Sequence, residues 1–147
     1  MGIEQEATAR AIIAAIEGEQ LDDDRISRVV DDLSTDAKWH VYAWEAPHVG
    51  HDAIRAELRR QAPLFSDYQT EIVTLGSVGS TVFMERLDSY TVLDVPMTTH
   101  VAAAFEFDGD GKVAVWREYL DRKEIETKMS VDISTISRIG GASASAP

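Results

Sequence analysis

The sequence predicts an α+β domain in which helices come first and an antiparallel meander follows. Up to about residue 62, hydrophobic residues recur at helical spacing, whereas beyond it Val, Phe, Thr and Tyr alternate with polar residues. Turn signals that contain Gly or Pro separate the later segments. A chain of 147 residues suits one domain with one core. We therefore expect helices packed on one face of a curved, mostly antiparallel sheet, which encloses a deep pocket if it curls around its apolar face.

The first part of the chain contains four predicted elements before the meander, three helices and one short strand. The segment "EQEATARAIIAAIEG" predicts a helix over about Glu4–Glu17 that ends at Gly18. The segment "LDDDRISRVVDDL" predicts a second helix, because its aspartates favour the positive N-terminal end. The aromatic, alternating "AKWHVYAWE" predicts a short strand. A third helix is expected to begin near His51 or Asp52 in "GHDAIRAELRRQAPLF".

The second half predicts four strands and a last helix. The strands are "YQTEIVTLGSVG", "STVFMERLDSYTVL", "MTTHVAAAFEFDG" and "KVAVWREYLD". The turn segments "VGS" and "DGDGK" and the proline Pro96 separate them. The segment "RKEIETKM" predicts a short helix. Because "GGASASAP" is small and polar, we expect one domain over 1–133 and a flexible tail over 134–147.

The composition excludes several classes of partner and site. A net charge of −12 argues against nucleic acid and anionic membranes, which attract clustered Lys and Arg. The absence of cysteine excludes disulfides, a thiol nucleophile and a thiolate metal site. No segment has the pattern of a signal peptide or of a membrane-spanning helix, so we expect a cytoplasmic protein. The histidines of "HVGH" and the aspartates of "DGDG" are weak metal motifs, and we expect neither metal nor cofactor.

Three polar residues on the predicted strands could perform acid–base chemistry. Arg86 and Asp88 share one face of a strand, and Asp121 lies where the last strand ends. If they meet in one cavity, a permanently charged guanidinium lies between two carboxyls whose titrations split into an acid and a base. The alternative is a solvent-exposed ion pair, which contributes well under about 1 kcal/mol to stability.

The motifs around these residues resemble the limonene-1,2-epoxide hydrolase family. The "ERLD" segment resembles the family's E-R-x-D strand, "WREYLD" its W-R-D-Y-F-D strand, and "VGHDAIRAEL" its Y-G-R-D-A-V helix start. The resemblance covers roughly Glu4–Met129. It implies a cone-shaped α+β barrel of the SnoaL and ketosteroid isomerase type, usually a homodimer.

The resemblance also implies an activity and its residues. Family members open an epoxide with water in one step and without a cofactor, so the implied partners are water and a small apolar epoxide. Asp121 is matched to the base that deprotonates water, Asp88 to the acid that protonates the epoxide oxygen, and Arg86 to the bridge between them.

The family's water-holding Tyr-x-Asn pair is replaced in this sequence. An ungapped count back from Gly50 puts the pair at His40 and Tyr42, which could still hold water or substrate. His100 and the run of alanines after it imply a roomier or more polar pocket. Two alternatives therefore stay open: an isomerase or cyclase that acts on a polyketide or terpenoid-like substrate, and a binding protein without catalysis.

Overall fold

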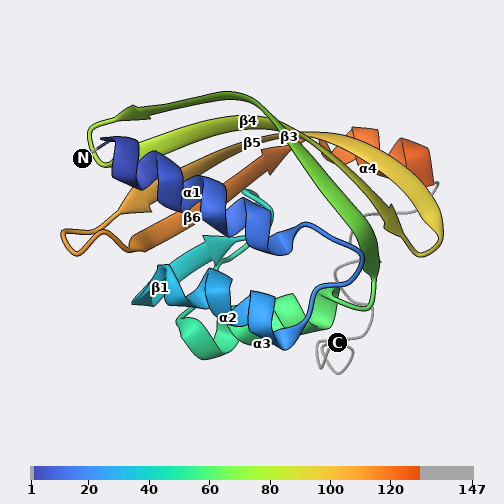
Figure 1. Ribbon diagram of the computed structural model, residues 1–147. Coiled ribbons are helices and arrows are strands. Elements are labelled where there is room, and N and C mark those ends of the chain that lie inside the picture. The colour runs from blue at the N-terminus through green and yellow to red at the C-terminus, as the bar shows by residue number, and fades with distance from the viewer. Residues whose placement is uncertain (1, 130–147) are drawn as a thin grey trace.

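The computed structural model describes residues 2–129, and it confirms the predicted α+β fold (Figure 1). The elements in chain order are α1 (Gly2–Ile16), α2 (Asp23–Asp31), β1 (Leu33–His40), β2 (His48–Val49), α3 (His51–Gln61), β3 (Phe65–Val78), β4 (Thr81–Val92), β5 (Val95–Phe107), β6 (Val113–Leu120) and α4 (Arg122–Met129). The expected tail over 134–147 lies outside the described residues, and the domain limit at 133 stays a prediction.

The strands form a curved mixed sheet in the order β2-β1-β6-β5-β4-β3. The meander from β3 to β6 is antiparallel, as predicted, and so is the β1–β2 pair. The exception is the parallel pair of β1 and β6, which joins the short early strand to the end of the meander. Within residues 2–129, β2 and β3 are the two edge strands of the sheet. The expected cone is therefore an open, strongly curved sheet.

Strand β3 bends over the helices because its pairing with β4 shifts register twice (Figure 1). The shifts fall between Ser66 and Gln69 and between Ile72 and Thr74. Asp67, inside the first shift, has a positive φ of 52°. Such bulges add a residue to one strand and increase its local bend. The bend turns the first part of β3 toward the helices and so forms one wall of the interior.

A glycine fixes the junction between α1 and this bent strand. Gly18 has a φ of +126°, which side chains with a Cβ rarely adopt, and an added Cβ would lie 2.5 Å from Arg25 Nη1. Its N–H donates to the Tyr68 carbonyl, and the Tyr68 N–H donates to its carbonyl, both at 2.8 Å. The sequence predicted Gly18 as a helix end. In the structure, Gly18 also holds β3 beside the end of α1.

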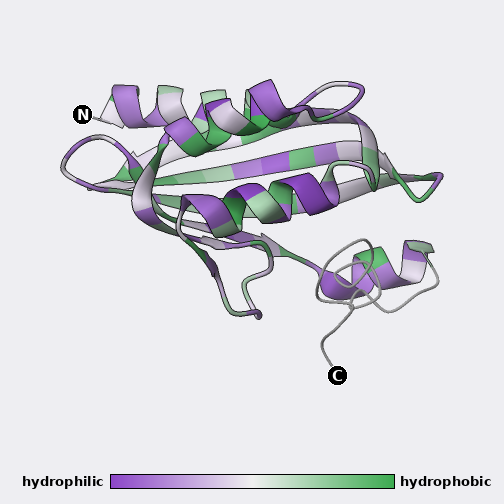
Figure 2. Ribbon diagram, turned by 90° about the horizontal axis from the view of Figure 1, so that it is seen from below, coloured by the Kyte–Doolittle hydropathy of each residue, from purple (hydrophilic) through white to green (hydrophobic). Residues whose placement is uncertain are grey.

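The core fills the space between the helices and the concave face of the sheet. Ile12 of α1, Val29 of α2 and Ile54 of α3 are fully buried there, together with Phe105 and Trp116 from the sheet. Each helix shows alternating hydrophobic and hydrophilic bands along its turns, as expected for helices with one buried face (Figure 2). None of the helices over residues 2–129 is long and apolar enough to span a bilayer.

Two phenylalanines on neighbouring strands test this division between core and surface. Phe105 of β5 is fully buried, whereas Phe83 of β4 is 50% exposed on the opposite face. We expect Phe105→Ala to lower the free energy of unfolding by about 3–5 kcal/mol, because it leaves a cavity in the core. The matched Phe83→Ala variant should lose less than about 1 kcal/mol. Urea denaturation followed by circular dichroism measures both, and equal losses would contradict the assigned core.

Candidate active site

A deep cavity lies between the concave face of the sheet and the helices. Its volume is about 120 Å³. A cavity of this size accommodates several water molecules or a small organic ligand. Most of its wall is apolar, with Ile13, Ile16, Leu21, Leu58, Phe65, Val101, Leu120 and Ile125 among the lining residues.

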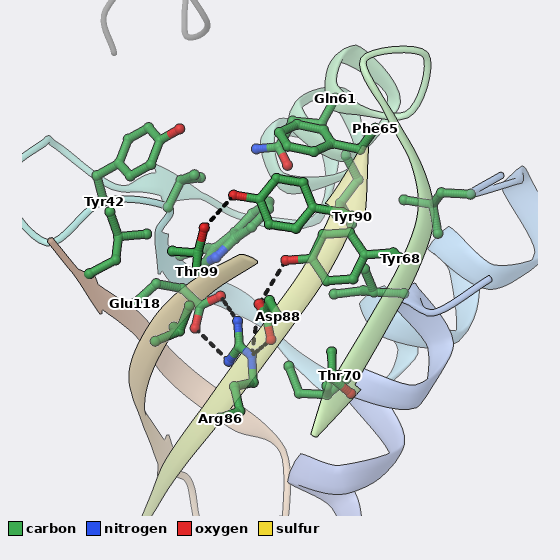
Figure 3. A pocket seen from close by; sticks show the side chains of 18 of the residues that line it. Tyr42, Gln61, Phe65, Tyr68, Thr70, Arg86, Asp88, Tyr90, Thr99 and Glu118 are labelled. Carbon is green, nitrogen blue, oxygen red and sulfur yellow. Dashed lines mark hydrogen bonds and ion pairs between the residues drawn. The ribbon is translucent and has the colours of Figure 1, made fainter. Parts of the chain in front are cut away.

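Arg86 lies at the bottom of this cavity between two carboxylates (Figure 3). Its Nε donates to Asp88 Oδ1 at 2.9 Å and to Oδ2 at 3.1 Å. Its Nη1 donates to Glu118 Oε2 at 2.9 Å and its Nη2 to Oε1 at 2.5 Å. Arg86 is 4% exposed and Asp88 1%, and the Glu118 side chain is 12% exposed. This pairing is a buried triad of one guanidinium and two carboxylates.

The sheet register explains why these three side chains meet. Arg86 of β4 pairs with Val101 of β5, and Glu118 of β6 pairs with Ala103 of the same strand. Neighbouring strands lie about 4.8 Å apart, so the β4 and β6 residues are separated by roughly 10 Å. Long side chains on both strands are needed to cover that distance, and the small Ala103 leaves space beside Glu118.

Burial and charge oppose one another within the triad. Burial raises the pKa of Glu118 above its usual value, although the Arg86 guanidinium beside it works in the opposite direction. Burial alone would lower the pKa of Arg86, but the charges and hydrogen bonds of Glu118 and Asp88 raise it well above its usual value. Arg86 therefore stays charged, and Glu118 binds a proton more readily than an exposed glutamate does.

Two stacked tyrosines line the wall next to Asp88. The Tyr68 hydroxyl donates to Asp88 Oδ2 at 2.7 Å, and the Tyr90 hydroxyl pairs with Thr99 Oγ1 at 2.7 Å. The two rings lie 5.1 Å apart and nearly parallel, at 7°. Burial, with the Asp88 charge adding to it, raises the pKa of Tyr68 well above its usual value, so its hydroxyl keeps its proton.

The structure corrects the expectation that Asp121 meets Arg86. Asp121 is exposed, is not among the lining residues, and accepts the backbone N–H groups of Lys123 and Glu124 at 2.9 and 3.3 Å. It caps the first turn of α4 instead. The reason is strand alternation: Asp121 continues the outward face of β6, whereas Glu118 belongs to the inward face with Trp116 and Leu120.

Of the three residues expected to bind water or substrate, only Tyr42 lines the cavity. Its ring stacks on Trp44, and burial raises its pKa to about 12. His40 follows the buried Trp39 on β1, so its side chain points away, and its Nδ1 lies 3.3 Å from the Glu45 carbonyl oxygen. His100 is 77% exposed and pairs with Glu124 at 3.1 Å. The placement of the two histidines at the cavity was wrong, because both alternate outward from their strands.

The histidines and aspartates of the weak metal motifs also have local partners. His51 Nε2 lies 2.9 Å from the Leu33 carbonyl oxygen, and Asp108 accepts the N–H groups of Asp110 and Lys112 within a turn. Across residues 2–129, no cluster of three or more acidic or histidine side chains is arranged to hold a metal ion.

Sequence reasoning missed Glu118 and Tyr68. A signal for Glu118 was present, because Glu118 alternates with Trp116 and Leu120 on the more apolar face of the last strand. Tyr68 gave a weaker signal: it is one of several inward residues of β3, and its contact with Asp88 depends on the β3–β4 register. In that register Thr70, two residues along from Tyr68, is the direct partner of Asp88.

Removing the shared guanidinium should destabilise the fold in a pH-dependent way. We expect Arg86→Met to cost about 3–5 kcal/mol near neutral pH, because it leaves two buried carboxylates without a counter-charge. Losing Arg86 raises the pKa of Glu118 further above its unfolded value, so the folded variant gains stability as the pH falls. Urea denaturation should show that the loss of unfolding free energy relative to the wild type is smaller at about pH 5 than at about pH 7.

The matched control is Arg117→Met on the outer face of β6. Arg117 pairs with Glu106, and their side chains are 27% and 42% exposed. This variant should lose no more than about 1 kcal/mol, with little dependence on pH. A deficit in Arg86→Met that matched this control would contradict the buried triad.

Solved structures show the same fold at low sequence identity. A limonene-epoxide-hydrolase-like epoxide hydrolase of Mycobacterium tuberculosis is 20% identical, with a TM-score of 0.73 over 92% of this chain and 96% of that one. A Catenulispora acidiphila protein with a ketosteroid-isomerase-like fold, in complex with trimethylamine, is 14% identical. Its TM-score is 0.71, and the match covers 84% of this chain and 92% of that one. An NTF2-like protein of unknown function from Burkholderia pseudomallei is 15% identical. Its TM-score is 0.72, and the match covers 87% of this chain and 98% of that one.

The sequence itself decides between the families that share this fold. No curated protein matches it. Residues 3–130, in contrast, match the limonene-1,2-epoxide hydrolase catalytic domain, and this range contains every member of the triad. The chain therefore belongs to the limonene-1,2-epoxide hydrolase family.

Proposed function

We propose that the protein hydrolyses a small apolar epoxide to a vicinal diol by one-step attack of water, without a cofactor. The observation that carries the proposal is the triad of Asp88, Arg86 and Glu118 at the bottom of an apolar cavity. Family membership and the epoxide hydrolase among the similar structures support the same activity. In this proposal Glu118 takes the place that sequence reasoning gave to Asp121.

Glu118 is the proposed general base. Both of its oxygens accept from the planar fork of Arg86, an arrangement that fits the ionised carboxylate. A carboxylate has about four acceptor positions, and Arg86 does not use all of them, so a water molecule can also donate to Glu118. Because burial raises the pKa of Glu118, this carboxylate takes a proton from water more readily than an exposed one does.

Asp88 is the proposed general acid. Of the three guanidinium nitrogens of Arg86, only Nε donates to Asp88, whereas both terminal nitrogens donate to Glu118, so the guanidinium charge is directed mainly at Glu118. The water oxygen forms a bond to one epoxide carbon while the bond from that carbon to the epoxide oxygen breaks. One proton passes from water to Glu118, and another passes from Asp88 to the epoxide oxygen. The products are the diol, a protonated Glu118 and an ionised Asp88, and return of one proton to Asp88 completes the cycle.

The substrate class follows from the cavity. The apolar side chains of α1, α3, β5 and α4 favour a substrate with a small hydrocarbon body. The polar side chains Tyr42 and Gln61 lie at the end of the cavity remote from Arg86 (Figure 3). The homodimer that the family resemblance implies stays a prediction, which sedimentation of the purified protein would test.

One observation favours a second candidate, an isomerase or cyclase. The positions expected to hold the attacking water are His40, which points away from the cavity, and Tyr42. An acid–base pair without a held water could move a proton on the substrate instead of hydrolysing it. Oxygen-18 water separates the two reactions: a diol that carries one labelled oxygen supports hydrolysis, and an unlabelled isomer supports this second candidate.

Isosteric amide variants test the assignment of the two carboxyls. We expect Glu118→Gln and Asp88→Asn each to lower kcat/KM for the best substrate of an epoxide panel by about 100-fold or more, because each removes a proton-transfer group. Asp121→Asn is the matched control, and it should keep turnover close to that of the wild type. Loss of activity in Asp121→Asn with full activity in Glu118→Gln would restore Asp121 as the base and overturn the role of Glu118.

The pH dependence tests the protonation state of the base. Glu118 must be ionised to accept a proton, and burial raises its pKa above the usual value of about 4.5. Activity should therefore fall as the pH drops through this raised pKa, at a higher pH than for an ordinary glutamate. The measurement is kcat/KM as a function of pH, with enzyme stability checked at each point. An acid limb at or below the usual glutamate range would contradict a raised pKa of the base.

A further inference from the structure

Within residues 2–129, the side chains that donate to Asp88 are Arg86 and Tyr68, the latter through its hydroxyl. The hydroxyl approaches Oδ2 at 2.7 Å, a short distance for an O–H donor. Asp88 is 1% exposed, so water contributes little to the solvation of its charge. Any negative charge that forms on Asp88 therefore depends on these two donors.

The fold holds Tyr68 firmly in this orientation. Two backbone hydrogen bonds to Gly18 fix its main chain, and its ring packs flat on Tyr90 and edge-on to Phe65. The bulge at Asp67 adds one residue to β3, which lets both Phe65 and Tyr68 line the cavity despite their odd spacing. A hydroxyl positioned in advance loses little free energy when a charge appears next to it.

The titratable and charged groups around Asp88 come from several elements. They are Arg86 and Tyr90 on β4, Tyr68 on β3, Glu118 on β6, and Glu17 after α1, which accepts the Thr70 hydroxyl at 2.9 Å. From β5 the neighbour is neutral Thr99, and α1 and α4 contribute the apolar Ile13, Ile16 and Ile125 to the same cavity. The carboxylate of Glu118 opposes a second negative charge, and Tyr68 is the neutral donor that offsets this repulsion.

On the basis of the proposed hydrolysis, we propose that Tyr68 is a positioning residue that makes Asp88 a stronger acid. As Asp88 passes its proton to the epoxide oxygen, its oxygens gain negative charge, and the Tyr68 O–H donates to that charge. The hydrogen bond is stronger to the ionised product than to the neutral acid, so it lowers the barrier to protonation. Because burial keeps Tyr68 protonated, the donor is present throughout the working pH range.

The kinetic test compares two variants that each remove one hydroxyl from the same ring stack. Tyr68→Phe should lower kcat by roughly 10- to 100-fold, the loss of a hydrogen bond to a charged group, with KM changed much less. Its alkaline limb of kcat should move to higher pH, because Asp88 holds its proton more tightly. Tyr90→Phe removes a hydrogen bond to Thr99 and none to Asp88. The pH dependence of kcat in this variant should therefore have its limbs at the wild-type pH values. An unchanged pH profile in Tyr68→Phe would overturn the proposal.

A second measurement does not depend on turnover. Carbon-13 NMR of aspartate-labelled protein, with Asp88→Asn to assign the signal, follows protonation of the Asp88 carboxyl without substrate. The titration midpoint should lie at higher pH in Tyr68→Phe than in the wild type, and at the wild-type value in Tyr90→Phe. Equal midpoints in all three proteins would overturn the role of Tyr68. Failure of the wild type to hydrolyse any epoxide would overturn the proposed function instead, so the two failures are distinguishable.

Discussion

The Arg86 guanidinium is the interaction on which the site depends. Two buried carboxylates facing one cavity would repel each other and lose their hydration, and a single permanently charged fork satisfies both. Arg86 donates unequally to the two carboxylates, because both of its terminal nitrogens donate to Glu118 and only its Nε donates to Asp88. This asymmetry gives the two carboxyls different environments, which is what an acid and a base acting on the same substrate require.

The rest of the fold places this group in an apolar surrounding. Strand pairing fixes Arg86 and Glu118 two strands apart, and Ala103 leaves room for their side chains to meet over β5. The bulges of β3 bend it over the cavity and bring Tyr68 to Asp88, while the contact with Gly18 ties that bend to the end of α1. The same curvature that buries the core therefore also shields the triad from bulk solvent.

The fold was largely predictable because its signals are local. Each signal depends only on residues that are close together in the sequence. These signals are the helical spacing before residue 62, the alternation after it and the turn residues between strands. The "RKEIETKM" helix occupies the predicted residues as α4, and the third helix begins at His51 as expected. The parallel pairing of β1 with β6 was not predicted, because it joins segments that are about eighty residues apart along the chain.

The sequence by itself determined the α+β class, the strand that carries Arg86 and Asp88, and the family pattern around them. Only the tertiary structure decided which carboxylate is their partner, since Glu118 and Asp121 lie on opposite faces of the same chain segment and only the buried face meets Arg86. It also decided that Tyr68 lines the site and that His40 and His100 do not. The physical reason is the same in each case. Alternation divides a strand into two faces, but which face is buried, and which residue lies opposite, is set by pairing and packing with distant segments.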